Sequence, residues 1–263
     1  MFLVCGEVLF DVFVAGQRDH GLSLDARPGG SPYNVAIGLA RLGQPVEFLT
    51  GLSDDVLGRR LLPFMKREGV GLAHAVKSDR PTALSLVDLD AAGVPAYAFY
   101  PETPAYSTLR AADLPRLTDA IRAIHIGSIA TVLEPIGGAL AHLAERECAS
   151  RLVSYDPNVR LSVVSDPAVW RRRLEGLAGV VHLLKISAED LDLLYPGRAH
   201  DEAARAWLAQ GVRLVVITRG SQGAAAWTRR HHVALAGRPV TVVDTVGAGD
   251  SYQAALLAGL AEG

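Results

Sequence analysis

The segment Asp244-Thr245-Val246-Gly247-Ala248-Gly249-Asp250 lies between two apolar runs, residues 240–243, typical of a β-strand, and residues 252–260, typical of a helix. Strand, tight glycine turn and helix together are the repeating unit of an α/β fold. The first N–H groups of a helix have no partner within it, and the helix dipole adds partial positive charge there. Because Gly247 and Gly249 let the backbone approach a ligand closely, this junction predicts an anion site.

Asp250 adds a carboxylate to the same junction, in the first helical turn. A bound phosphate needs no carboxylate beside it, whereas a hydroxyl that loses its proton while attacking a phosphate needs a base. The segment therefore predicts an anion hole with a general base, and so phosphoryl transfer to an alcohol. A structural turn with an acidic helix cap is the alternative interpretation.

Two other glycine motifs are excluded. A dinucleotide fingerprint requires Gly-x-Gly-x-x-Gly or Ala, and Tyr252 occupies the sixth position here. A P-loop requires Lys-Ser or Lys-Thr after its last glycine, and the chain contains no such run.

The composition is that of an ordinary intracellular enzyme. The 263 residues are 49% hydrophobic, which suffices for one large α/β domain. The net charge of −2 gives no reason to expect nucleic acid or membrane partners. Cys5 and Cys148 are too few for a disulfide framework. No signal peptide or transmembrane run is recognised, so we expect a cytoplasmic protein.

Beyond residue 114 the chain alternates short apolar strands with helices, which predicts a parallel sheet covered on both faces. Ligands of such sheets lie at the carboxyl ends of the strands. Four polar segments follow strands there: Asp156-Pro157-Asn158-x-Arg160, Lys185-Ile186-Ser187, Thr218-Arg219-Gly220 and residues 244–250. Their convergence strengthens the catalytic interpretation.

The first hundred residues differ from this pattern. Residues 2–15 are predicted to form a strand, on which Glu7 and Asp11 could simply face solvent. Residues 83–90 and 95–100 alternate around Ala91-Ala92-Gly93, which predicts a β-hairpin and with it a separate small sheet. After Gly29-Gly30, Pro32 suits the start of a helix that ends near residue 42.

Together, residues 244–250 and Pro28-Gly29-Gly30-Ser31-Pro32-Tyr33-Asn34-Val35-Ala36 resemble the two signature regions of the ribokinase-like (PfkB) sugar kinases. The motifs at residues 156–160 and Thr218-x-Gly220-x-x-Gly223 match as well, and the resemblance runs from residue 4 to the last residue. It implies a single ribokinase-like α/β domain over residues 1–263, with a parallel central sheet and helices on both faces. A small β-sheet lid, from about residues 8–27 and 83–101, would exclude water from the sugar.

The resemblance also implies roles for individual residues. Asp250 is expected to take the proton from the sugar hydroxyl, and the N–H groups of Gly247, Ala248 and Gly249 to hold the charge that develops on the phosphoryl group. The residues expected to contact the sugar are Asp11, Gly29, Gly30, Asn34, Tyr100 and Arg160. An ordinary polar helix residue remains the alternative for Asn34, and lid packing for Tyr100.

ATP is the expected phosphoryl donor, with Mg²⁺ to neutralise its phosphates. The residues expected to bind the nucleotide are Asn158, Lys185, Thr218, Gly220 and Gly223. Asp190 is the expected metal carboxylate, and Asp244 is expected to form part of a monovalent-cation site, for example for K⁺.

Two departures from the family pattern stand out. The usual Asn-x-x-Glu that organises the metal's water ligands is here Ser187-Ala188-Glu189-Asp190, in which Asp190 is one methylene shorter than Glu. Family members also continue for a few dozen residues beyond the position of Gly263, and that segment would complete the adenine pocket and the cation site.

The chain looks most like bacterial fructokinases, notably at Ala98-Phe99-Tyr100-Pro101-Glu102. Relatives that take keto-acids such as 2-keto-3-deoxygluconate tend to carry an arginine where this chain has Pro101, so a neutral sugar is favoured. Fructose is the first expectation, and ribose, a nucleoside or the keto-acid follow. Two other classes stay open, a sugar-binding relative without turnover and, disfavoured, a nicotinamide oxidoreductase. The lid is expected to pair two subunits into a homodimer.

Overall fold

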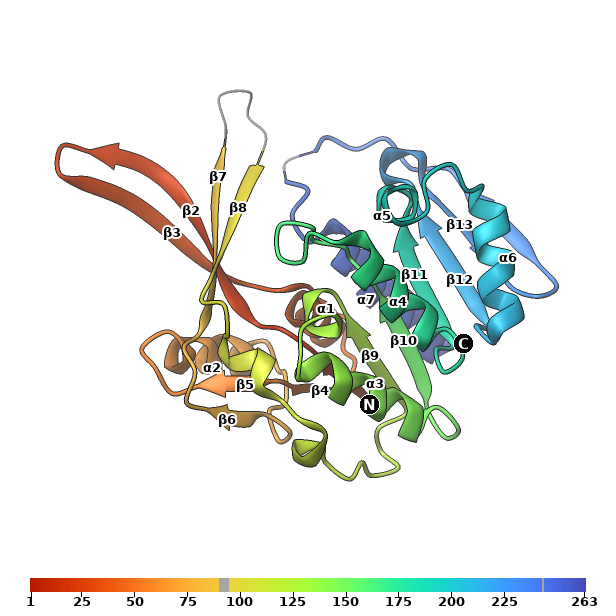
Figure 1. The fold of residues 1–263 in the computed structure, drawn as a ribbon, viewed down its shortest axis with the longest axis horizontal. Helices are drawn as coiled ribbons and strands as arrows, with labels where there is room; N and C mark the ends of the chain where they lie inside the picture. Colours follow the sequence, from red (N-terminus) through yellow and green to blue (C-terminus); the bar gives the residue numbers. More distant parts are fainter. Residues whose placement is uncertain (90–94, 243) are drawn as a thin grey trace.

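A long, mostly parallel sheet runs through the computed structural model, which describes residues 1–89, 95–242 and 244–263 (Figure 1). Its strand order is β14-β13-β12-β11-β10-β9-β1-β4, parallel from β12 to β4 and antiparallel at β13 and β14. The strands are β1 (Phe2–Cys5), β4 (Val46–Leu49), β9 (Ala123–Gly127), β10 (Leu152–Asp156), β11 (Leu183–Ser187), β12 (Leu214–Thr218), β13 (Ala224–Trp227) and β14 (His232–Leu235).

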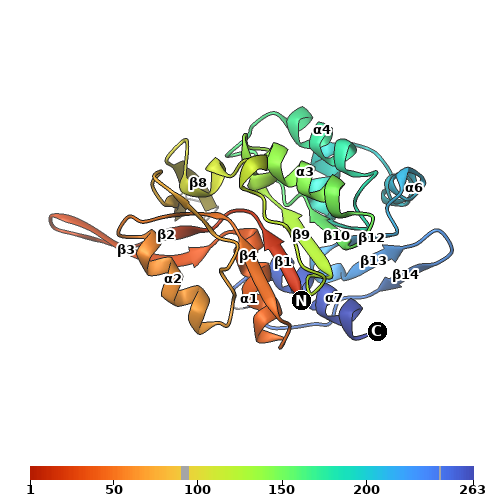
Figure 2. The same ribbon diagram turned by 90° about the horizontal axis from the view of Figure 1, so that it is seen from below.

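Helices cover both faces of this sheet, as Figure 2 shows. Helices α1, α2 and α7 share one hydrophobic core with the sheet, and α3 to α6 share a second core on the other face. The helices are α1 (Ser31–Arg41), α2 (Gly58–Arg67), α3 (Ile136–Glu147), α4 (Pro167–Leu177), α5 (Ala188–Leu194), α6 (His200–Gln210) and α7 (Ala248–Glu262). The predicted fold class, an α/β sheet with helices on both faces and a separate small sheet, is confirmed.

The small sheet has four strands in the order β3-β2-β7-β8 and projects from one end of the body (Figure 1). Its strands are β2 (Leu9–Arg18), β3 (Gly21–Gly29), β7 (Ala83–Leu89) and β8 (Pro95–Tyr100). Strands β7 and β8 pair antiparallel, as the alternating pattern predicts, while the predicted turn at residues 91–93 lies outside the described residues. Two short strands, β5 (Gly51–Ser53) and β6 (Val76–Ser78), pair beside the body.

The expectation of one strand over residues 2–15 is wrong. The chain turns at Gly6, so that β1 lies in the central sheet and β2 in the small sheet. Glu7 follows this turn and is only 1% exposed, so it does not face solvent. Local alternation could not reveal the change of sheet, because both parts have the same strand character.

The strand predicted for residues 240–242 is absent, and Val243 lies outside the described residues. Val240 and Val242 are 76% and 66% exposed and no strand pairs with them. An apolar run forms a strand only where a neighbouring backbone takes up its hydrogen bonds, and here β14 ends before it. Helix α7 begins at Ala248, earlier than the apolar pattern indicates.

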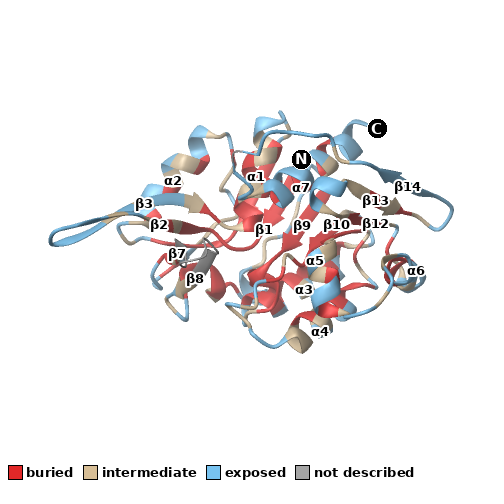
Figure 3. Ribbon diagram, turned by 90° about the horizontal axis from the view of Figure 1, so that it is seen from above, coloured by how far each residue is buried: buried red, intermediate tan, exposed pale blue. Residues whose placement is uncertain are grey.

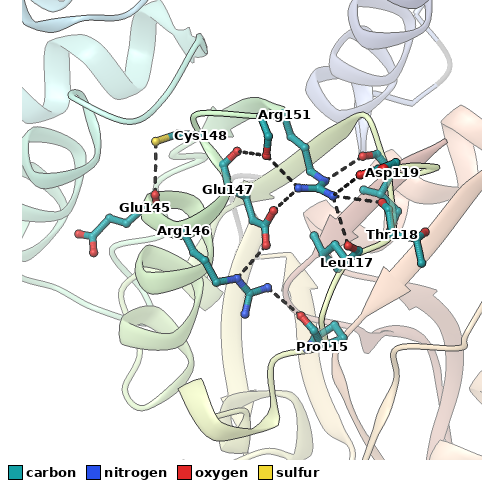
Figure 4. A network of polar contacts seen from close by, with 11 residues as sticks. Pro115, Leu117, Thr118, Asp119, Glu145, Arg146, Glu147, Cys148 and Arg151 are labelled. Atoms are coloured by element: carbon teal, nitrogen blue, oxygen red, sulfur yellow. Dashed lines mark hydrogen bonds and ion pairs between the residues drawn. The ribbon is translucent and has the colours of Figure 1, made fainter.

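Figure 3 shows the buried residues concentrated in the central sheet and the inner sides of its helices. At the amino end of β10 a polar network ties the loop before β9 to the end of α3 (Figure 4). There Arg151 pairs with Glu147 and donates to the carbonyls of Ile121, Leu117 and Thr118. The network therefore joins elements at the amino ends of the strands, at the opposite end of the sheet from their carboxyl ends. Among the described residues, no helix is long and apolar enough to cross a membrane.

Candidate active site

Asp250 is held from two sides at the start of α7. Its Oδ1 accepts a hydrogen bond from Ser31 Oγ at 2.7 Å, and its Oδ2 accepts one from Asn34 Nδ2 at 2.8 Å. Ser31 and Asn34 lie three residues apart on α1, so both side chains point from the same face of that helix. Helices α1 and α7 pack against each other, and this contact brings the two segments recognised in the sequence together (Figure 3).

Burial raises the pKa of Asp250, and the negative charge of Asp156 raises it further. The two hydrogen bonds from Asn34 and Ser31, together with the charge of Lys185, act in the opposite direction without cancelling the rise. A carboxylate with a raised pKa is a stronger proton acceptor than an exposed aspartate. Asp250 is therefore suited to remove a proton from a bound hydroxyl.

A cavity opens in front of this carboxylate, between α1, the small sheet and the carboxyl ends of β9 and β10. Of the residues predicted to take part in catalysis or sugar binding, most meet there. The predicted residues that line the cavity are Asp11, Gly30, Asn34, Asn158, Arg160, Gly247 and Asp250. Their chain positions span 240 residues, so only the fold can bring them together.

Asp11 enters the cavity from β2, and its side chain reaches diagonally across to Gly29 on β3, which is the cross-strand partner of Leu9. A Cβ atom at Gly29 would overlap with Oδ2 of Asp11, so the glycine makes room for the carboxylate. Burial raises the pKa of Asp11, while the hydroxyl of Ser85 and the charge of Arg160 favour its ionised form. The pair Asp11 and Arg160 thus offers a hydrogen-bond acceptor and a donor to a polyhydroxylated ligand.

Gly247 adopts a left-handed backbone conformation, with φ of 72°, immediately before the helix. That conformation directs the chain into α7, and Val246, Gly247 and Asp250 line the cavity there. The amide of Ser251 donates to the carbonyl of Gly247 at 2.8 Å, and the amide of Ala248 donates to the carbonyl of Thr245 at 3.2 Å, which closes the turn. The turn and the helix start predicted from the sequence are therefore present, and the anion hole stays a prediction.

Lys185 lies behind the anion hole rather than in the cavity lining. Its Nζ is 2.7 Å from Oδ2 of Asp156, and both side chains are almost completely buried, at 4% and 1% exposure. A Cβ atom placed on Gly249 would lie 3.1 Å from the same Nζ. Lys185 thus brings positive charge next to the loop that would hold a transferred phosphoryl group.

Of the predicted nucleotide residues, Thr218 ends β12, and Gly220 and Gly223 follow it at the carboxyl ends of the strands. Thr218 is the cross-strand partner of Ser187, and so lies beside the segment that carries Asp190. These three residues do not line the cavity in front of Asp250. They lie at the carboxyl end of β12, further along the sheet from the cavity.

The two predicted metal residues differ in their surroundings. Asp190 lies in the first turn of α5, and burial, with the nearby charge of Asp156, raises its pKa to about 6. A cation beside it would favour its ionised form, which fits a carboxylate that helps to hold Mg²⁺ through water. Asp244 is exposed, and its Oδ1 accepts a hydrogen bond from the amide of Val246. No cluster of three metal-ligating side chains occurs among the described residues.

The structure does not bring Tyr100 to the cavity. Its side chain is 56% exposed, whereas the preceding residue, Phe99, lines the cavity. Successive side chains of a strand point to opposite faces, so only one of the two can face the ligand. The prediction for Tyr100 is corrected in favour of Phe99.

Sequence reasoning missed several polar residues of the site. Glu7, Ser31, Ser85 and Ser128 all line the cavity. Burial raises the pKa of Glu7 to about 7, and its Oε2 accepts a hydrogen bond from the amide of Ala130. The spacing of Ser31 and Asn34 on one helix face could have identified Ser31, but no local pattern indicates Glu7, Ser85 or Ser128.

The family model described as "pfkB family carbohydrate kinase" matches residues 3–263. The chain is 39% identical to a fructokinase of Rhizobium leguminosarum bv. trifolii over 260 residues, which are 99% of this chain and 79% of the relative. It is also 34% identical to fructokinase-2 of Solanum lycopersicum, over 88% of this chain and 71% of the relative.

Solved structures of sugar kinases superpose on most of the chain. A fructokinase from Xylella fastidiosa with bound ATP matches with a TM-score of 0.88 and 27% identity, over 99% of this chain and 81% of the other. A fructokinase from Vibrio cholerae O395 with bound fructose, ADP and calcium matches with a TM-score of 0.86 and 27% identity, over 98% and 82%. The similarity thus extends through the central sheet and the small sheet.

Proposed function

Because this chain belongs to the pfkB family of carbohydrate kinases, we propose that it transfers the γ-phosphoryl group of ATP to a hydroxyl of fructose, with Asp250 as the general base. The observation that carries the assignment of the base is its position. Asp250 is buried, lines the cavity and stands at the amino end of α7, directly after the glycine segment.

The sugar hydroxyl attacks the γ-phosphorus of ATP and gives its proton to a carboxylate oxygen of Asp250. The bond between the γ-phosphorus and the bridging oxygen of ATP breaks, and ADP leaves with the electron pair of that bond. The amides of Gly247, Ala248 and Gly249 and the charge of Lys185 stabilise the oxygens of the phosphoryl group during transfer. Loss of one such donor typically costs about 10²–10³ in rate.

The remaining cavity residues orient the sugar. Asp11 accepts hydrogen bonds from sugar hydroxyls, and Arg160 and Asn158 donate toward the sugar and the phosphates. Phe99 supplies an apolar surface for the ring, and the small sheet above the cavity keeps water away from the phosphoryl group.

ATP acts together with a divalent metal ion, which neutralises its phosphates. Asp190 is the carboxylate that would help to hold this ion. We assign three residues to the nucleotide because they lie at the carboxyl end of β12, beside the segment that carries Asp190: Thr218, Gly220 and Gly223. A monovalent cation near Asp244, for example K⁺, is a separate prediction, tested by the dependence of the rate on K⁺ concentration.

Replacement of Asp250 by Asn tests the assignment. Because general base catalysis contributes about 10²–10⁴, we expect kcat to fall by this factor, or about 3–5 kcal/mol in activation free energy. Fructose binding should persist, since the amide keeps the size of the carboxylate. ADP release with fructose, ribose and 2-keto-3-deoxygluconate as acceptors measures both activity and sugar choice.

Glu262→Gln is the matched control, because Glu262 is exposed on the same helix. The variant should keep the wild-type rate. A kcat of Asp250→Asn equal to the wild-type value would reject Asp250 as the base. A wild-type protein that binds fructose with ATP and Mg²⁺ present but releases no ADP would be a sugar-binding relative instead.

We also propose a homodimer formed through the small sheet. Its β2–β3 hairpin projects from the body in Figure 1, and Leu22 and Leu24 on β3 are 61% and 52% exposed. Apolar side chains on a projecting sheet are suited to pairing with a second copy. Light scattering of the wild type and of Leu24→Lys tests this, and a monomeric wild type contradicts it. A cytoplasmic location is likewise a proposal, consistent with Cys5 and Cys148 as free thiols.

A further inference from the structure

Gln253 is a fully buried polar residue on the apolar side of α7. The buried residues of this helix form one stripe, which consists of Asp250, Gln253, Ala254, Leu257 and Ala258. Gln253 is 0% exposed, and its Nε2 donates a hydrogen bond to Ser154 Oγ on β10 at 2.8 Å. A buried amide is costly unless it is hydrogen-bonded, so this contact is specific and not incidental.

Ser154 is itself held by the next strand. Its Oγ lies 3.2 Å from Nδ1 of His125, its cross-strand partner on β9. Burial and the charge of Lys185 lower the pKa of His125 to about 3, so the ring is neutral and can accept a hydrogen bond. The Ser154 hydroxyl accepts a hydrogen bond from Gln253, so it can donate its own proton to Nδ1 of His125. The contact with His125 therefore orients the hydroxyl oxygen that accepts from Gln253.

Strand β10 carries a second anchor two residues further on. Asp156 lies on the same face as Ser154 and forms the buried ion pair with Lys185. Lys185 in turn lies beside Gly249 at the anion hole. Strand β10 therefore contacts two parts of the site. Ser154 binds helix α7 through Gln253, and Asp156 binds the side chain of Lys185.

Close to Gln253, helix α7 meets α1 through small residues. Ala254 faces Gly38 of α1 so closely that a Cβ atom at Gly38 would lie 2.6 Å from the Ala254 Cβ. Small residues offer few interlocking side chains at this point of closest approach, and Leu257 packs into the core one turn further along. Two buried polar anchors of α7 are described, Asp250 to α1 and Gln253 to the sheet, about 4.5 Å apart along the helix axis, while Glu262 accepts an exposed hydrogen bond from Gln44 at the far end.

We propose that Gln253 is a positioning residue for phosphoryl transfer, whose hydrogen bond to Ser154 keeps Asp250 and the amides of the glycine segment aligned with Lys185. The inference rests on the proposed kinase function and deepens it. A shift of the helix start changes the alignment of the reacting groups, to which rates are very sensitive. The sugar is held mainly by other elements, so its binding is affected less.

Gln253→Leu tests the proposal, because Leu fills similar volume without the amide. We expect kcat to fall about 10–100-fold, with the KM for fructose within about 2-fold of the wild-type value. Ser154→Ala should have the same effect, and the double variant should be no slower than either single variant, because both remove one contact.

Leu257→Ala is the control for lost stability, since Leu257 is buried on the same helix one turn further along. It should lower Tm at least as much as Gln253→Leu and still keep kcat within about 2-fold of the wild type. Equal losses of kcat in the two variants would overturn the positioning role, as would multiplicative losses in the double variant.

Hydrogen exchange supplies a second readout that does not depend on activity. The amide of Ser251 donates to Gly247 O at 2.8 Å and so reports the integrity of the helix start. We expect faster exchange of this amide in Gln253→Leu and not in Leu257→Ala. Unchanged exchange in Gln253→Leu overturns the inference even if the protein phosphorylates fructose. A wild type without kinase activity refutes the proposed function, while the exchange result still decides whether Gln253 holds the helix start.

Discussion

Replacement of Lys185 by Met removes one partner of the most deeply buried ion pair described in the protein. The Nζ atom of Lys185 lies 2.7 Å from Asp156, whose side chain is 1% exposed and whose Oδ1 has no other side-chain or backbone partner among the described residues. Removing the lysine thus leaves an uncompensated carboxylate in the interior, which costs about 3–5 kcal/mol. For a chain of this size each kcal/mol lowers Tm by about 2 °C, so we expect a fall of roughly 6–10 °C.

The double variant Lys185→Met/Asp156→Leu separates stability from catalysis. With both charges gone, the desolvation cost disappears and the free energy of unfolding should return to within about 2 kcal/mol of the wild-type value. The phosphoryl group still lacks the positive charge behind Gly249, so activity should stay low.

Urea unfolding and ADP release measure the two effects, with Lys77→Met, an exposed lysine on β6, as the control. The reasoning is refuted if Lys185→Met unfolds at the same urea concentration as the control. It is also refuted if the double variant regains kcat together with stability, because Lys185 would then have a purely structural role.

Two further predictions concern stability. Burial raises the pKa of Glu7 from 4.5 to about 7, so its carboxyl contributes stability that is complete below pH 4.5 and is lost as the pH rises to 7. The free energy of unfolding of the wild type should therefore fall relative to Glu7→Gln by on the order of 3 kcal/mol across that window, and a constant difference in urea titrations would contradict this. Arg151→Ala removes the centre of the network in Figure 4: it leaves the carbonyls of Leu117, Thr118 and Ile121 without this donor and leaves Glu147 paired with Arg146 alone. It should lower the free energy of unfolding by about 3 kcal/mol and leave kcat and KM unchanged, whereas a kinetic effect would show that the two ends of the sheet are coupled.

The sequence by itself determined the class of the fold and indicated the centre of the candidate site. The alternation of apolar strands and helices is a local pattern, and the parallel sheet with two covered faces follows from it. Gly247 and Asp250 were identified because a glycine turn and a carboxylate in the first helical turn have physical consequences that depend only on neighbouring residues. The resemblance of Asn34 and its neighbours to a second signature region extended the site to a distant segment.

The tertiary structure alone decided which side chains meet and which face water. The buried contacts of Lys185 with Asp156 and of Gln253 with Ser154 join elements far apart in the chain, and no local pattern indicates such pairs. The exchange of Tyr100 for Phe99 depends on which face of β8 turns to the cavity. Residues 240–242 have the composition of a strand but lack a neighbouring strand to pair with. Composition and periodicity are local properties, whereas burial and hydrogen-bond partners are supplied by other segments, and this physical difference separates what was predictable from what was not.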